Sequence, residues 1–184
     1  MNLQADTIPV NRNVLASKAA ISYCLYFLVL LYLLSWIGID QSNPNLSGVE
    51  MVISYIATWV PYILAIIFVQ DRVKKGFEGY ISFGKAFSTG LRVAVYTGLF
   101  LSIVMILYYK VLDPGAYQKI LDAAMEKAGD NDQQRQGIEM MKPYMVFFIG
   151  FGTAISYTLF GVLISLAGAA ILKNEKPFFF KTEE

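Results

Sequence analysis

Residues 19–39 read AAISYCLYFLVLLYLLSWIGI, and this run decides the fold class. It contains no Asp, Glu, Lys or Arg. A helix of this length, at 1.5 Å per residue, is about 31 Å long and matches the hydrocarbon core of a bilayer. A secretory signal has an apolar core of only about 7–15 residues and ends at a small-residue cleavage site, and neither feature fits this run. We therefore expect a retained membrane-spanning helix.

Three further stretches lack charged residues, at 51–70, 93–109 and 143–172. Each is long enough to cross a bilayer, which takes about 17–25 residues. Only 16% of the 184 residues are charged, and the mean hydropathy is +0.50. Soluble domains carry about 25% charged residues, so we expect a membrane protein. The predicted fold is an all-α four-helix membrane bundle, a single domain over 1–184, with spans at about 19–39, 51–70, 88–111 and 143–172.

The basic residues indicate how the chain threads. Segments 1–18, 71–92 and 173–184 together hold ten basic and six acidic residues. The alternate segments, 40–50 and 110–142, hold five basic and eight acidic residues. Lys and Arg accumulate on the cytoplasmic side of membrane proteins. We therefore expect both termini to be cytoplasmic.

The segment 79–92, GYISFGKAFSTGLR, lies between the second and third apolar runs. Its aromatic residues recur at steps of three or four, which is the spacing of one helix face. Ser82 is a suitable N-cap residue. We expect a cytoplasmic interfacial helix before the third span, serving either as a docking surface for a partner or lipid or as an ordinary membrane-surface elbow. Its candidate surface residues are Tyr80, Phe83, Lys85, Phe87 and Arg92.

The motifs GYISF at 79–83 and AF at 86–87, followed by Gly90, resemble the signature of the family called domain of unknown function 4199. Segment 108–117, with its DPG sequence, also fits the family. The resemblance extends roughly from the first helix to the fourth. It implies four spanning helices in a bacterial inner membrane. It brings no catalytic residues, because no activity is established for the family.

The fourth span carries a stripe of small residues with a four-three-four-three spacing, which places them on one helix face. Small residues let helix backbones approach closely within a membrane. We expect the stripe to pack against another helix of the same chain, and homodimerisation through it is the alternative. The stripe consists of Ala154, Thr158, Gly161, Ser165 and Gly168.

Pro61 interrupts the hydrogen-bond pattern of the second span. Proline has no N–H, so the carbonyl of Ala57 loses its helical partner. In a membrane another group must satisfy such a carbonyl, and the hydroxyls of Thr58 and Ser54 are placed to do so locally. We favour a static kink at Pro61, and the alternative is a hinge beside a solute site.

Residues 113–142 form the outer connection, for which we expect a helical loop. Asp113 is suited to cap a helix whose first residue is Pro114, and Gly129 is suited to end it. The methionines nearby, Met140 among them, suggest gap-filling packing rather than copper ligation.

Reactive side-chain combinations are absent from this sequence. It has no histidine, and its one cysteine, Cys24, lies in the first apolar run. Without histidine there is no catalytic triad, and no phosphate-binding loop or metal-ligand spacing occurs. The net charge of +1 gives no reason to expect nucleic-acid binding. We therefore predict neither an enzyme nor a cofactor.

The resulting functional hypothesis is a non-enzymatic scaffold or accessory subunit of the inner membrane. Its expected partners are membrane lipids and a membrane or cytoplasmic protein. The alternative is a small-solute channel or transporter that acts as a homo-oligomer. Pro61 and the nearby hydroxyls favour that alternative, while the lack of charged residues within the spans argues against a proton-coupled transporter.

Overall fold

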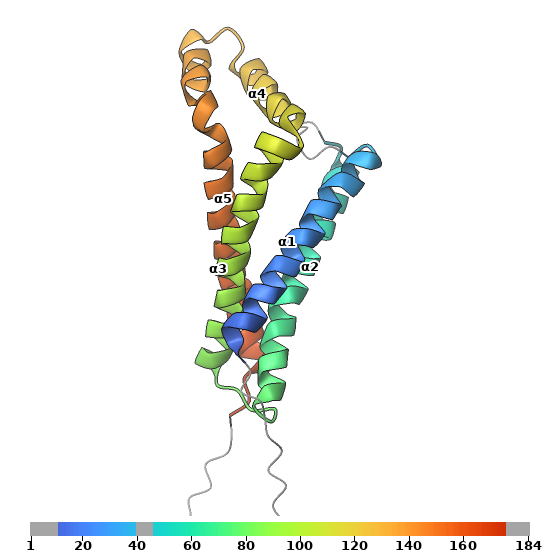
Figure 1. Ribbon diagram of the computed structural model, residues 1–184, viewed down its shortest axis with the longest axis vertical. Coiled ribbons are helices and arrows are strands. Elements are labelled where there is room, and N and C mark those ends of the chain that lie inside the picture. The colour runs from blue at the N-terminus through green and yellow to red at the C-terminus, as the bar shows by residue number, and fades with distance from the viewer. Residues whose placement is uncertain (1–10, 40–45, 176–184) are drawn as a thin grey trace, which may run out of the picture.

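The chain forms a bundle of long helices in the computed structural model, which describes residues 11–39 and 46–175 (Figure 1). Four helical segments are long and apolar enough to cross a membrane: α1, α2, α3 together with the π-helical turn η1, and α5. The prediction of an all-α membrane bundle is confirmed. The elements are α1 (Arg12–Trp36), α2 (Gly48–Gly76), α3 (Phe83–Leu107), η1 (Tyr108–Leu112), α4 (Pro114–Ala128) and α5 (Asp132–Leu172).

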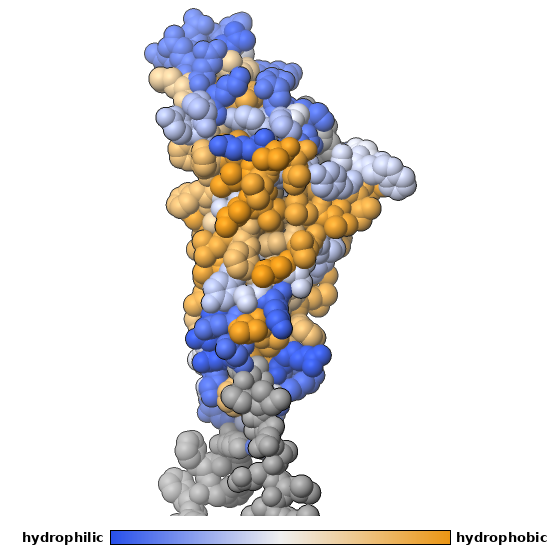
Figure 2. All heavy atoms as spheres, viewed as in Figure 1, coloured by the Kyte–Doolittle hydropathy of each residue, from blue (hydrophilic) through white to orange (hydrophobic). Residues whose placement is uncertain are grey.

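An apolar band crosses the middle of the face shown in Figure 2, between two hydrophilic ends. Large apolar side chains point outward there, such as Leu25, Leu64 and Phe151, each at least 58% exposed. Burying so much apolar surface in hydrocarbon instead of water is strongly favourable. The band therefore fits a multi-pass membrane protein.

The beginning of α1, the α2–α3 connection and the end of α5 lie at one end of the bundle, which we call the basic end (Figure 1). Two backbone hydrogen bonds, of 2.8 and 2.9 Å, join Ile81 and Asn174 there. The guanidinium of Arg12 donates to the hydroxyl of Ser88 over 3.2 Å. The number of candidate spans is even, so the beginning of the first helix and the end of the last helix lie at the same end of the bundle.

The pair α3 and α5 packs most extensively, and α1 and α2 pack against it. Glycines on both helices explain the close approach. A Cβ atom on Gly98 would lie 2.7 Å from the carbonyl oxygen of Ala154, and one on Gly150 would lie 2.8 Å from Ile106. Real Cβ atoms do not come so close to a backbone oxygen, so only glycine fits at position 98, and a larger residue at position 150 requires the side chain of Ile106 to move.

The outer connection contains helix α4 and the first turns of α5, as a helical hairpin. Asp113 accepts the N–H of Ala116 over 2.9 Å, and Pro114 is the first helical residue, which confirms the predicted cap. Gly129 ends the helix with a φ of +54°. The hydroxyl of Tyr117 donates to the carbonyl of Lys142 and ties α4 to α5, and partial burial raises the pKa of this phenol.

The segment predicted as an interfacial helix continues directly into the third span. Residues 83–107 form one continuous helix, and Ser82 occupies its N-cap position without a capping side-chain bond. Within the predicted surface segment, Ala86 and Gly90 are buried. A Cβ on Gly90 would lie 2.6 Å from the hydroxyl oxygen of Ser165. The segment therefore packs inside the bundle along this small-residue face, while its aromatic face stays outside.

Candidate functional site

The predicted surface residues of segment 79–92 gather on the first turns of α3 and the connection before it. Tyr80, Phe83 and Lys85 are exposed, whereas Phe87 and Arg92 are partly buried. The rings of Phe83 and Phe87 stack with centroids 6.3 Å apart. We call these five residues the aromatic–basic surface.

The ammonium of Lys85 lies 4.0 Å from the ring centroid of Phe77, within the range of a cation–π contact. Nearby on α2, Lys75 pairs with Asp71 at 2.6 Å. Lys85 therefore places a basic side chain against an aromatic ring at the basic end. Such a surface suits a partner that offers both apolar and acidic groups.

The stripe of small residues on α5 lies against α3 and α2 of the same chain. A Cβ on Gly161 would overlap Ala94 of α3 and the hydroxyl of Tyr62 of α2. Thr158 lies against Gly98, and Gly168 lies against the side chain of Gln70. The small residues of this stripe therefore already contact other helices of the same chain.

Gln70 is the main polar contact between three helices, and sequence reasoning missed it. Its side chain is fully buried, and its Nε2 donates to the carbonyls of Ala86 on α3 over 3.1 Å and Ser165 on α5 over 3.0 Å. Its Oε1 has no hydrogen-bond partner among the described residues and lies against Gly168. The only signal in the sequence is that the amide of Gln70 ends the uncharged run 51–70. At that position it indicates the edge of the span and not a contact between helices.

Pro61 lies inside α2, and the carbonyl that it frees is satisfied from another helix. The hydroxyl of Tyr26 on α1 donates to the carbonyl of Ala57 over 2.8 Å. The predicted role of Ser54 is wrong, because its hydroxyl is buried without a partner among the described residues. Proline opens a carbonyl toward the neighbouring helix, and a tyrosine of that helix is long enough to reach it.

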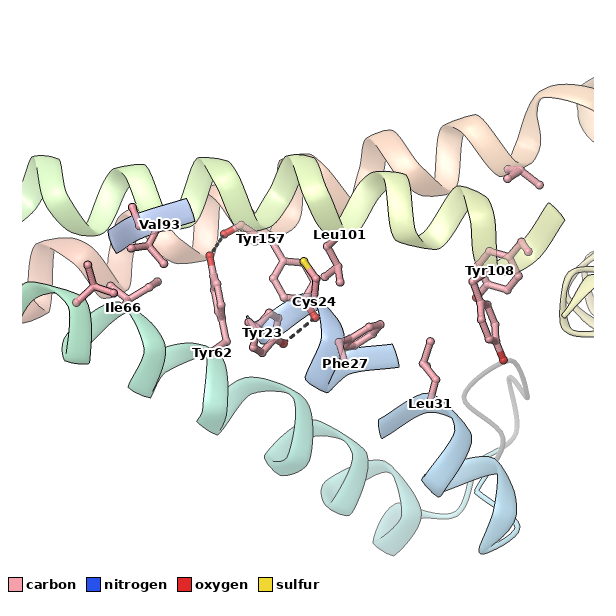
Figure 3. Close-up of a cluster of buried hydrophobic side chains, with 14 of the residues drawn as sticks. Tyr23, Cys24, Phe27, Leu31, Tyr62, Ile66, Val93, Leu101, Tyr108 and Tyr157 are labelled. Atoms are coloured by element: carbon pink, nitrogen blue, oxygen red, sulfur yellow. Dashed lines mark hydrogen bonds between the residues drawn. The ribbon is translucent and has the colours of Figure 1, made fainter. Parts of the chain in front are cut away.

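Tyr23 of α1, Tyr62 of α2 and Tyr157 of α5 meet within the bundle (Figure 3). The ring of Trp59 of α2 stacks on that of Tyr157, and we call these four residues the tyrosine cluster. The hydroxyl of Tyr62 donates to the carbonyl of Tyr157 over 2.7 Å. The hydroxyls of Tyr23 and Tyr157 are 3.3 Å apart, and that of Tyr23 also donates to the carbonyl of Thr58 over 2.9 Å. Each of these hydroxyls is hydrogen-bonded to a backbone carbonyl or to another hydroxyl of the cluster. Their role is therefore to hold the packed helices together.

A cavity of about 300 Å³ lies beside the tyrosine cluster. Its lining includes Tyr55 and Thr58 of α2 and also Ser54, whose hydroxyl has no hydrogen-bond partner among the described residues. Across residues 11–39 and 46–175, no group of three or more Cys, Asp and Glu side chains is placed to hold a metal ion. The groups that this cavity offers to a ligand are therefore hydroxyls and aromatic rings.

The comparisons with known proteins give one positive result. The family described as "Protein of unknown function (DUF4199)" matches residues 16–174. No curated protein and no solved structure matches the chain. The match covers nearly all of α1 and the whole of α2, α3 and α5, together with the outer connection. The chain therefore belongs to this family of unknown function.

Proposed function

We propose that this protein is a non-enzymatic scaffold or accessory subunit of a bacterial inner membrane, with both termini in the cytoplasm. The observation that carries the proposal is the close packing of α2, α3 and α5. Glycines bring α3 and α5 into contact, and Gln70 fills the space between α2 and these two helices. A protein whose helices pack so closely, and whose described residues include no group of side chains placed to hold a metal ion, is suited to act through its surface.

The aromatic–basic surface is the part of the molecule that best suits a protein partner. Phe83 is 39% exposed although it is large and apolar, and Lys85, two residues further along the helix, is exposed as well. Interfaces are enriched in aromatic residues and use charge to orient the partner. Ten basic residues occur on the segments that we expect in the cytoplasm, so the proposed partner has an acidic, partly apolar docking segment.

Purification from native membranes in mild detergent, followed by quantitative mass spectrometry, tests the proposal. We expect one protein to co-purify in stoichiometric amount with the wild-type chain. The double variant Phe83→Ala/Lys85→Ala should lose at least about 90% of that protein, because removing an interface anchor costs about 1–2 kcal/mol or more. Both positions are exposed, so the fold should be retained.

A matched control removes the same kinds of side chain at the other end of the molecule. Lys127 and Tyr144 are exposed there, and Lys127→Ala/Tyr144→Ala should keep the partner. Equal loss in both variants, or purification of the chain free of any stoichiometric partner, would contradict the accessory role.

The second candidate function is an oligomeric channel or transporter for a small solute. The hydroxyl-lined cavity with its unpartnered Ser54 favours it. Solute uptake into liposomes that contain the purified protein, abolished when Ser54→Leu fills the cavity, would support this function over the accessory role.

A further inference from the structure

A groove of about 500 Å³ runs between α1 and α2, separate from the aromatic–basic surface on α3. Small residues of both helices, including Ala19, Ser22 and Ala65, line it and leave room between the two helices. Its outer walls, Leu64 and Phe68, are 58% and 53% exposed, so the groove is open to its surroundings. Because these walls belong to a helix that is apolar enough to cross a membrane, the groove faces the hydrocarbon of the membrane.

The groove has the depth of one membrane leaflet. On α1 its lining extends from Leu15 to Tyr26, which corresponds to about 16 Å of helix at 1.5 Å per residue. Half of a bilayer core of about 30 Å is about 15 Å. The deep end lies where the hydroxyl of Tyr26 bonds to the carbonyl of Ala57, beside Pro61. The space thus matches a single extended acyl chain that enters from the basic end.

Two basic side chains lie at the end of the groove that is nearer the basic end of the bundle. Lys18 of α1 lines it and is exposed. Arg72 of α2 lies one turn beyond Phe68, with its guanidinium carbon 5.0 Å from the centroid of that ring. The neighbouring carboxylate of Asp71 is paired with Lys75 at 2.6 Å. In the described parts of the chain, no ion pair engages Lys18 or Arg72.

We propose that this groove binds one acyl chain of an anionic phospholipid, whose phosphate is held between Lys18 and Arg72. The apolar lining gives affinity for the chain, and the cations select the headgroup charge. The proposal does not rest on the accessory role or on which face of the membrane is cytoplasmic. It requires only that the basic end lies at a membrane surface, because both cations then stand at the level of the headgroups.

Native mass spectrometry of the full-length protein, with equimolar phosphatidylglycerol and phosphatidylcholine in non-ionic detergent, tests the proposal. Wild type should retain at least about five times more phosphatidylglycerol, the factor expected for one cation near an anionic headgroup. Lys18→Ala/Arg72→Ala should lose this preference. Ala65→Leu should lower the retention of both lipids, because the larger side chain fills the groove.

The charge control is Lys127→Ala/Arg135→Ala, which removes two exposed cations at the other end and should keep the wild-type preference. Equal retention of the two lipids by wild type would overturn the proposal. So would a preference that survives in Lys18→Ala/Arg72→Ala, or a wild-type chain whose groove is covered by a second copy and retains no lipid. If Ala65→Leu does not fold, the two double variants alone decide the result.

Discussion

Gly161→Leu is expected to prevent stable folding of the bundle, with a loss of at least about 3 kcal/mol in the free energy of unfolding, at the upper end for overpacked cores. Gly161 lies at the contact of α5 with α3 and α2. Even a single Cβ atom would overlap Ala94 and the hydroxyl of Tyr62. Leucine adds three further carbons, so the helices must separate and the contacts along α3 and α5 weaken together.

The stability of the purified variant in mild detergent, followed by size-exclusion chromatography after heating, measures this effect. Gly152 provides the matched control on the same helix. It is exposed, and a Cβ there would meet nothing within 4 Å. Gly152→Leu should therefore be as stable as wild type or slightly more so, because glycine costs about 0.5–1 kcal/mol within a helix. Equal behaviour of the two variants would show that the stripe on α5 does not pack as described.

Gln70→Glu is expected to have the second-largest effect, a loss of about 3 kcal/mol, comparable to placing a charged residue within a membrane span. The Nε2 of Gln70 donates to two carbonyl oxygens, of Ala86 and Ser165. A carboxylate in its place would bring a negative oxygen against both carbonyls. The site is fully buried, so water does not reduce this repulsion.

Two further variants separate charge from shape at this position. Gln70→Met removes the hydrogen bonds but keeps the size, and it should cost only about 1–2 kcal/mol, because both carbonyls still accept bonds within their own helices. Gln133→Glu makes the same chemical change on an exposed side chain in the first turn of α5. It should be neutral or slightly stabilising, because negative charge is favourable near a helix N-terminus. We expect thermal stability to decrease in the order Gln133→Glu, Gln70→Met, Gln70→Glu. A stable Gln70→Glu variant would contradict this order.

Local chemistry made much of the fold predictable. The four uncharged runs give the four spans because each must satisfy its own backbone in a membrane. Asp113, Pro114 and Gly129 mark the two ends of α4 because capping depends on residues next to each other in the sequence. The helices extend beyond the uncharged runs, as α2 does up to Gly76. Side chains such as Lys74 and Lys75 reach water from a helix end, so charge does not end a helix.

The contacts between distant residues were less predictable. Tyr23 and Tyr157 meet across 134 positions of the sequence, and no local pattern pairs them. Tyr26 satisfies the carbonyl that Pro61 frees, because the side chain of a neighbouring helix reaches it and the local Ser54 does not. The segment 79–92 has two different faces. The aromatic face of that segment was recognised, but the opposite face, with Ala86 and Gly90, packs in the bundle.

The central claim is that the chain spans the membrane with its basic end in the cytoplasm. Cysteine labelling of intact cells with a membrane-impermeant maleimide tests it most directly, in a background where the buried Cys24 is replaced by alanine. Gly84 near the basic end and Gly137 in the outer hairpin suit this purpose, because a Cβ at either position meets nothing within 4 Å. We expect Gly137→Cys to be labelled in intact cells and Gly84→Cys only after the membrane is opened. Labelling of Gly84→Cys in intact cells would contradict the orientation, and labelling of both would contradict the membrane-spanning fold.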